Sequence, residues 1–175
     1  MIKKEIFFTE AEATDAPAFI TFMNQVATET DFLVMDDTGF RLSRQEMEVI
    51  FEANLSNPRQ LCLLAKCGEE VIGAINVKTA SPSRINHIGG IFLAVRKDYW
   101  GHGLGSILLE EVLAWAEEGQ VLGRLELTVQ IRNERAVQLY QKVGFEIEGI
   151  QKRGARTDAG EWLDLYYMGK LIGDK

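Results

Sequence analysis

The chain has 175 residues and a formal net charge of −7, with 46% hydrophobic and 26% charged residues. This is the composition of a globular protein, and the length predicts a single domain over residues 1–175. The acidic balance argues against a protein held on nucleic acid by a basic face, and no apolar run approaches the ~20 residues that span a bilayer. We expect a soluble, cytoplasmic protein without nucleic-acid or membrane partners.

The first half of the chain is expected to form a strand, two helices and a hairpin. These elements cover about residues 2–13, 16–29, 44–57, 61–65 and 71–78. Thr14 and Asp15 are good N-caps for the first helix, and Ser43 with Glu46 completes a capping box for the second. The segment 30–43 between the two helices has no sustained period and is expected to be a loop.

The second half continues with strands and helices in alternation. Strands are expected at about 85–95, 125–130, 145–151 and 161–172, and helices at 104–119 and 133–142. Gly89 and Gly90 inside the first of these strands indicate a bulge. Asn133 opens the last helix and Gly144 closes it. This order predicts one α/β fold with a mixed sheet.

The two cysteines, Cys62 and Cys67, are an odd number of positions apart on one expected strand. Their side chains therefore point to opposite faces and cannot form a disulfide. Unpaired thiols fit a reducing compartment. The cysteines, His87 and His102 have no metal-ligand spacing, so we expect no metal.

A glycine-rich turn joins the strand Ile91–Val95 to the helix that follows, with Gly101, Gly103 and Gly105. The amides of a helix's first turn have no partners within the helix, and the helix dipole makes that end electropositive. Such a turn predicts a site for phosphate or pyrophosphate. Neither register of the turn gives the dinucleotide pattern G-x-G-x-x-G, and no P-loop string occurs in the chain.

The turn fits a different pattern, the acyl-CoA-binding signature Arg/Gln-x-x-Gly-x-Gly/Ala over Trp100–Gly105. Downstream, NERAVQLYQKVGFEIEG at residues 133–149 is similar to the segment N-x-x-A-x-x-x-Y-x-x-x-G-F. With the string LAVRKDYWGHGLGSILLEEVLAWA around the turn and with the order of elements, the whole chain resembles the GNAT superfamily of acetyl-CoA-dependent N-acetyltransferases. The resemblance implies a mixed, mostly antiparallel sheet of about seven strands with about four flanking helices. Trp100 departs from it, because the family has Arg or Gln there.

The resemblance also implies where acetyl-CoA binds. The pyrophosphate would lie on the turn formed by Gly101, His102, Gly103, Leu104, Gly105 and Ser106. The backbone of Leu93, Ala94 and Val95 would pair with the pantetheine arm. Further contacts would come from Asn133, from Lys142 at the ribose 3′-phosphate, and from Arg96 in place of the missing signature residue. Asn133 is equally explained as a helix cap, and Lys142 as a solvated cation near a helix end.

The same resemblance assigns the chemistry. Tyr140 matches the tyrosine that protonates the leaving CoA thiolate, although a core aromatic is the plain alternative. The general base is Glu126, His87 or an ordered water. The acceptor site would be lined by Phe32, Asp36 and Asp37, because acidic and aromatic side chains suit a cationic amine.

We therefore predict an N-acetyltransferase that transfers acetyl from acetyl-CoA to a primary amine, by direct attack in a ternary complex. The acceptor is a small molecule or a peptide, and a homodimer fits the family. The alternative is a non-catalytic sensor that binds acyl-CoA.

Overall fold

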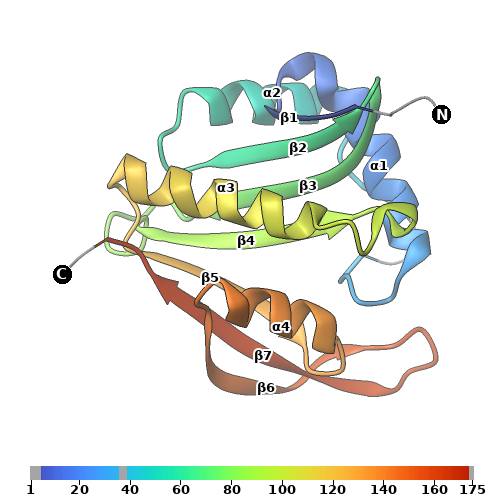
Figure 1. Ribbon diagram of the computed structural model, residues 1–175, viewed down its shortest axis with the longest axis vertical. Helices are drawn as coiled ribbons and strands as arrows, with labels where there is room; N and C mark the ends of the chain where they lie inside the picture. The colour runs from blue at the N-terminus through green and yellow to red at the C-terminus, as the bar shows by residue number, and fades with distance from the viewer. Residues whose placement is uncertain (1–4, 36–38, 174–175) are drawn as a thin grey trace.

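The computed structural model describes residues 5–35 and 39–173, which form one seven-stranded sheet with helices on both faces (Figure 1). The elements are β1 (Ile6–Glu10), α1 (Ala16–Glu29), α2 (Arg44–Leu55), β2 (Leu61–Cys67), β3 (Glu70–Thr79), β4 (Ile88–Val95), α3 (Leu104–Gly119), β5 (Arg124–Gln130), α4 (Glu134–Lys142), β6 (Glu146–Arg156) and β7 (Trp162–Leu171). Short 3-10 turns at 13–15 and 97–99 precede α1 and follow β4.

The strands follow the order β1-β2-β3-β4-β5-β7-β6, and every neighbouring pair except β4 and β5 is antiparallel. The prediction of a mixed, mostly antiparallel sheet of about seven strands with four helices is confirmed. The capping box of α2 is confirmed as well, because the Glu46 amide donates to Ser43 Oγ at 3.3 Å and the Ser43 amide donates to Glu46 Oε2 at 2.8 Å.

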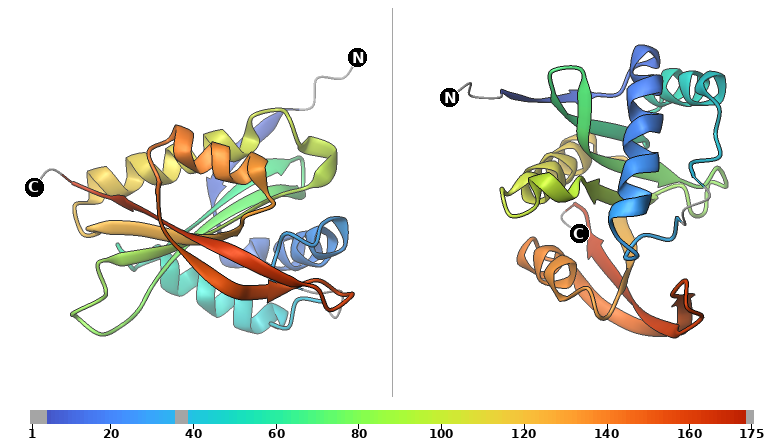
Figure 2. Two further views of the ribbon diagram at one scale, coloured as in Figure 1. Left: turned by 90° about the horizontal axis from the view of Figure 1, so that it is seen from below. Right: turned by 90° about the vertical axis from the view of Figure 1, so that its right-hand side faces the viewer.

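The helices divide between the two faces of the sheet, with α1 and α2 on one face and α3 and α4 on the other (Figure 2). Phe22 of α1 and Phe51 of α2 are fully buried on the first face, and Leu108 of α3 and Met168 of β7 on the second. Among the residues that the structure describes, no helix is long and apolar enough to cross a membrane.

The two cysteines lie on opposite faces of β2, as predicted. Cys62 is buried in the cluster under α1 and α2, and Cys67 packs against the cluster under α3 and α4. Burial, with a smaller contribution from the carboxylates of Asp15 and Glu10, raises the pKa of the Cys62 thiol to about 12. This thiol is therefore un-ionised and packs as a small apolar group.

One local prediction is wrong, and a second is confirmed only in part. The pairing of β3 with β4 is continuous through Gly89 and Gly90, without a bulge. Gly89 is required by packing instead, because a Cβ there would lie 2.7 Å from Val77 Cγ1 and 2.8 Å from Leu125 Cδ2. Asp15 is the N-cap residue of α1, as predicted, but its side chain does not bond the amides of that helix. Its carboxylate accepts from the Glu12 amide at 2.9 Å and closes the 3-10 turn before the helix.

The parallel pair β4 and β5 is joined over only three positions at the start of each strand, Ile88 to Arg124, Gly89 to Leu125 and Gly90 to Glu126. Beyond these positions each strand stays paired on its outer side, β4 with β3 and β5 with β7. Figure 1 shows the two strands adjacent at one end and apart at the other. The edges that face each other across this opening have no strand between them, so their backbone groups are available to a bound ligand.

Candidate active site

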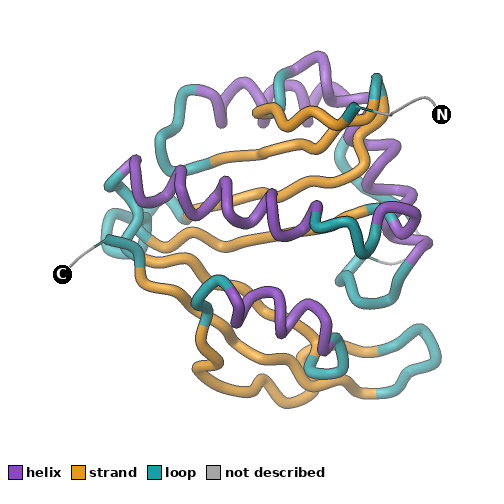
Figure 3. The backbone as a smooth tube through the Cα atoms, viewed as in Figure 1, coloured by secondary structure: helices purple, strands orange, loops and turns teal. Residues whose placement is uncertain are grey.

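A cleft of about 810 Å³ lies where β4 and β5 part. Its walls are the second half of β4, the glycine turn with the start of α3, the end of β5, most of α4 and the segment that follows α1. The connections that follow α1, β4, β5 and β6 gather at this end of the sheet (Figure 3). The cleft therefore combines a strand edge, a helix N-terminus and several loops.

The glycines of the turn have two different roles. Gly101 and Gly103 both have φ of +79°, in the left-handed region that favours glycine. Gly105 is inside α3, where a Cβ would lie 3.3 Å from Leu139 Cδ2, so its small size lets α3 approach α4. Gly103 is the N-cap of α3 without a side-chain cap, and no acid stands in the first turn. The first amides of α3 are thus left for an anion from outside the chain.

The structure brings most of the predicted binding residues to this cleft. Its lining includes Phe32, Leu93, Ala94, Val95, Gly101, Gly103, Leu104, Gly105, Ser106, Asn133, Tyr140 and Lys142. Asn133 also caps α4, because its side chain accepts from the Ala136 amide at 3.3 Å. The Val95 carbonyl already accepts a hydrogen bond from Trp100 Nε1 at 2.7 Å, so the indole covers that end of the strand edge.

Arg96 and the two candidate bases are placed elsewhere. Arg96 lies 3.7 Å from Glu29 and 3.8 Å from Glu70, and its side chain is only 14% exposed, so it cannot replace the signature residue. Glu126 accepts from Arg124 Nε at 2.9 Å, at the end of the sheet where β4 and β5 are still paired. Neither residue lines the cleft.

The two histidines also lie outside the lining of the cleft. The ring of His87 packs on Gly123, with Cδ2 3.4 Å from the place of a Cβ there, so it does not reach a substrate bound in the cleft. His102 is exposed in the glycine turn, which leaves its backbone as the part near a ligand. Asp36 and Asp37 lie outside the described residues, so their predicted role stays a prediction.

Tyr140 is 7% exposed and lines the cleft from α4. Its ring packs edge-on against Phe145, with 5.8 Å between the centroids. Burial raises the pKa of the phenol above its ordinary value near 10, because the low-dielectric surroundings penalise the phenolate. Tyr140 therefore keeps its proton at neutral pH and is a hydrogen-bond donor facing the cleft.

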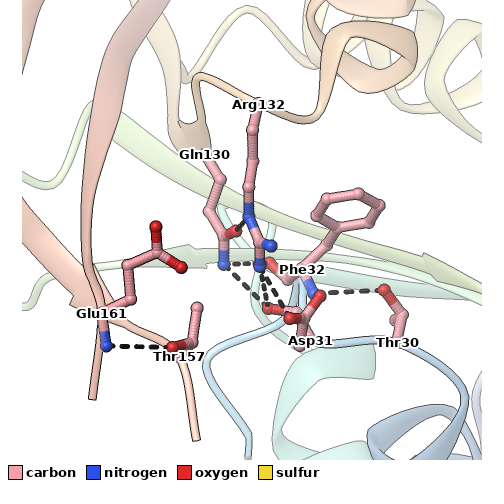
Figure 4. A network of polar contacts seen from close by, with 7 residues as sticks. All are labelled: Thr30, Asp31, Phe32, Gln130, Arg132, Thr157 and Glu161. Atoms are coloured by element: carbon pink, nitrogen blue, oxygen red, sulfur yellow. Dashed lines mark hydrogen bonds and ion pairs between the residues drawn. The ribbon is translucent and has the colours of Figure 1, made fainter. Parts of the chain in front are cut away.

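The far end of the cleft is held by a polar network that sequence reasoning missed (Figure 4). The buried side chain of Gln130 donates from Nε2 to the carbonyls of Asp31 at 2.9 Å and Phe32 at 3.3 Å. Its Oε1 accepts from Arg132 Nε at 2.7 Å, and Arg132 Nη2 pairs with Asp31 Oδ2 at 2.9 Å. The Arg132 guanidinium also lies 5.2 Å from the centroid of the Phe32 ring. This network ties the segment after α1 to the end of β5.

The described lining has an excess of positive charge, although the chain as a whole is acidic. Arg132, Arg135 and Lys142 are its cations, and Glu134 is its acid. Such a lining favours an anionic ligand through the local field. In the described part of the chain, no cluster of His, Cys, Asp and Glu side chains is arranged to hold a metal ion.

Comparison with known proteins agrees with the geometry. A family model described as the acetyltransferase (GNAT) family matches residues 28–145. The chain is 31% identical over 109 residues to the L-amino acid N-acetyltransferase AaaT of Escherichia coli (strain K12), covering 62% of this chain and 67% of that protein.

Two solved structures extend the comparison over nearly the full length. The acetyltransferase of the GNAT family from Streptococcus pneumoniae is 45% identical, with a TM-score of 0.94 over 96% of this chain and all of that chain. The structure of yncA from Salmonella typhimurium with its cofactor acetyl-CoA is 17% identical, with a TM-score of 0.83 over 98% of this chain and 96% of that one. At this lower identity the likeness shows the fold alone.

Proposed function

Because the chain belongs to the GNAT family of acetyltransferases, we propose that it transfers the acetyl group of acetyl-CoA to the α-amine of an amino acid with an apolar side chain. The observation that carries the proposal is the cleft between β4 and β5, which has a helix N-terminus open to an anion at one end and an apolar mouth holding the Arg132 guanidinium at the other. Tyr140, a buried proton donor, lines the same cleft.

The described residues fit the parts of acetyl-CoA. The turn Gly101–Gly105 offers unpaired amides to the pyrophosphate, and the open edge of β4 offers backbone groups to the amides of the pantetheine arm. A side-chain amide at Asn133 and an ammonium group at Lys142 face the same cleft. Acetyl-CoA supplies an acyl group on a thioester, which an amine can attack without a covalent enzyme intermediate.

The polar groups of the cleft have separate roles in direct transfer. The backbone of β4 orients the thioester, and the Tyr140 hydroxyl donates its proton to the departing sulfur as the C–S bond breaks and the N–C bond forms. Water then restores that proton. Since Glu126 and His87 lie outside the cleft, we propose that the proton of the attacking amine leaves to water in the open mouth.

The acceptor class follows from the mouth of the cleft. Phe32, Leu33 and Val34 present apolar side chains, and Val34 is 86% exposed. Beside them, Arg132 is fixed by Gln130 and Asp31 through Nε and Nη2, while no described residue bonds its Nη1. A fixed guanidinium whose Nη1 has no partner among the described residues suits a carboxylate, and the apolar surface suits the side chain of the same amino acid. This differs from the cationic amine expected from the sequence.

Rates of CoA thiol release with saturating acetyl-CoA test the proposal. We expect kcat/KM for L-leucine to exceed that for L-leucinamide and 3-methylbutylamine by about 10- to 100-fold, because a charge-assisted hydrogen bond contributes about 1.5–3 kcal/mol. Arg132→Gln should abolish this preference. Arg153→Gln is the matched control, because Arg153 also stacks on an aromatic ring, at 5.4 Å from Trp162, but lies outside the cleft lining.

Three outcomes would contradict the proposal. Spermidine or leucinamide acetylated as well as leucine would exclude recognition of a carboxylate. A peptide that begins with leucine and reacts better than free leucine would point to protein N-termini. If the ratio of kcat/KM for leucine to that for leucinamide were unchanged in Arg132→Gln, Arg132 would not contact the acceptor.

A further inference from the structure

We infer that Arg135 supplies the side-chain cation for the pyrophosphate of CoA and that Trp100 positions it. Trp100 occupies the first position of the signature, where the resembling family has Arg or Gln. The missing cation therefore comes from another element, the start of α4. The inference rests on the use of acetyl-CoA as cosubstrate and concerns how this chain holds its phosphates.

The Trp100 side chain cannot itself donate a hydrogen bond to an anion. Its indole Nε1 is the side chain's one donor, and it already donates to the Val95 carbonyl at 2.7 Å. That bond fixes the ring against the end of β4, beside the glycine turn. The partly buried ring presents a surface to the cleft, which both Trp100 and Arg135 line.

Arg135 lies on this surface. Its guanidinium carbon is 5.9 Å from the centroid of a Trp100 ring, within the range of a cation–π contact. Its Nη2 is 3.7 Å from the place of a Cβ on Gly101, so the cation lies directly beside the left-handed turn. Stacking through the face of the guanidinium leaves the N–H groups at its edge free to bond an oxyanion.

Arg135 differs from the other arginines near the site in having no acidic partner. Arg96, Arg124 and Arg132 each pair with at least one carboxylate. Within the described ranges 5–35 and 39–173, no carboxylate lies at ion-pair distance from Arg135, and its side chain is exposed. Its neighbour Glu134 also lines the cleft but is not at ion-pair distance from it.

Position along α4 favours the pyrophosphate over the ribose 3′-phosphate. Arg135 is in the first turn of α4 and touches the glycine turn, whose amides are open to an anion. Lys142, the other cation that α4 presents to the cleft, is two helical turns further on, a distance of about 10 Å along the axis. The two side chains therefore serve different parts of the ligand, and Arg135 is the one at the turn.

The first test compares three acyl donors with Arg135→Gln. We expect the Kd for acetyl-CoA to rise by about 10-fold, and by more at low salt. The Kd for 3′-dephospho-acetyl-CoA should rise by the same factor. For S-acetylpantetheine, which has no phosphate, kcat/KM should be the same in Arg135→Gln and in the wild type. The matched control is Arg156→Gln, since Arg156 is also exposed and stacks on Trp162 at 5.7 Å, away from the cleft.

The second test uses Trp100. Trp100→Arg returns the cation to the signature position and should restore tight binding to Arg135→Gln in the double variant. Trp100→Leu removes the ring and should weaken acetyl-CoA binding alone but add little in the Arg135→Gln background, because the two residues act as a unit. Melting temperatures of all variants report whether folding is retained.

The outcomes separate the inference from the proposed function. A wild-type Kd in Arg135→Gln overturns the inference while acetyl-CoA use stands. A loss that disappears with the 3′-dephospho donor assigns Arg135 to the ribose phosphate and also overturns it. Failure of the wild-type chain to bind acetyl-CoA at all would overturn the proposed function itself.

Discussion

The two ends of the cleft are built in opposite ways. At the end that we propose binds the phosphates of acetyl-CoA (the phosphate end), a strand, a glycine turn and a helix follow one another within residues 88–119. At the acceptor end, Gln130 holds the carbonyls of Asp31 and Phe32, which are 99 and 98 positions away in the chain. One end is fixed by local backbone geometry, and the other exists only when two distant segments have docked.

This difference predicts how substitutions should affect each end of the cleft. The phosphate end depends on two left-handed glycines, so a single side chain there affects binding at once. The acceptor end depends on hydrogen bonds between the segment after α1 and the end of β5. A substitution there should therefore make the lining of the acceptor site less well positioned rather than block the site. Tyr140 lines the same cleft from α4 and should affect chemistry without affecting either binding event.

The largest expected effect is that of Tyr140→Phe. Loss of the proton donor should lower kcat by about 10²- to 10⁴-fold while the Kd for acetyl-CoA and the KM for the acceptor change little. Steady-state kinetics and calorimetric titration measure the two quantities. Tyr166→Phe is the control, because Tyr166 packs against the same core but does not line the cleft. An unchanged kcat would make Tyr140 a packing residue.

The pH profile of the wild-type enzyme follows from the same residue. Because burial raises the pKa of the phenol, the proton is present below that pKa and is lost only as the pH rises through it. We expect kcat/KM to rise with pH as the acceptor amine loses its proton, and kcat to show no alkaline decline below about pH 10. A decline near pH 8 would contradict Tyr140 as the general acid.

A smaller effect, at the phosphate end alone, is expected from Gly103→Asp. A carboxylate at the N-terminus of α3 repels the pyrophosphate, so the Kd for acetyl-CoA should rise by about 10- to 100-fold. Gly68→Asp is a matched control, because Gly68 has φ of +61° against +79° at Gly103 and a Cβ at either position would have no heavy atom within 4 Å. Both variants should lose similar stability, and only Gly103→Asp should lose binding. Equal binding by both would show that the turn does not hold phosphate.

The contrast between the two ends also explains what could be predicted from the sequence. The capping box of α2, the glycine turn and the cap at Asn133 are set by residues within a few positions of one another. Local patterns were therefore enough to predict the elements and the glycine turn. They could not place Arg135 on Trp100, since that contact joins α4 to a turn more than thirty positions earlier.

The family resemblance made Glu126 a candidate base, and strand periodicity could not show that it lies outside the cleft. Glu126 and Thr128 share one face of β5, because alternate residues of a strand point the same way. Glu126 is opposite Gly90, where β4 and β5 are still paired, whereas Thr128 lies beyond the divergence and lines the cleft. The alternation of residues along a strand predicts which face of the sheet each side chain lies on. It does not predict where the neighbouring strand diverges, because that depends on the whole sheet. Arg96 was misassigned for a similar reason, because its acidic partner Glu29 comes from α1.

The smallest expected effect separates the acceptor end from the phosphate end. Gln130→Leu keeps the size of the side chain but removes the bonds to Asp31 and Phe32, so the wall after α1 is no longer tied to β5. We expect the acceptor KM to rise by about 10-fold, since each bond contributes about 1 kcal/mol, while the Kd for acetyl-CoA stays at the wild-type value. Ser43→Ala is the control at the other end of the same loop, because it removes only the cap of α2, at a cost of about 1 kcal/mol in unfolding free energy. If Ser43→Ala raised the acceptor KM as much as Gln130→Leu, loop stability in general would govern the acceptor site, and the network at Gln130 would have no particular role.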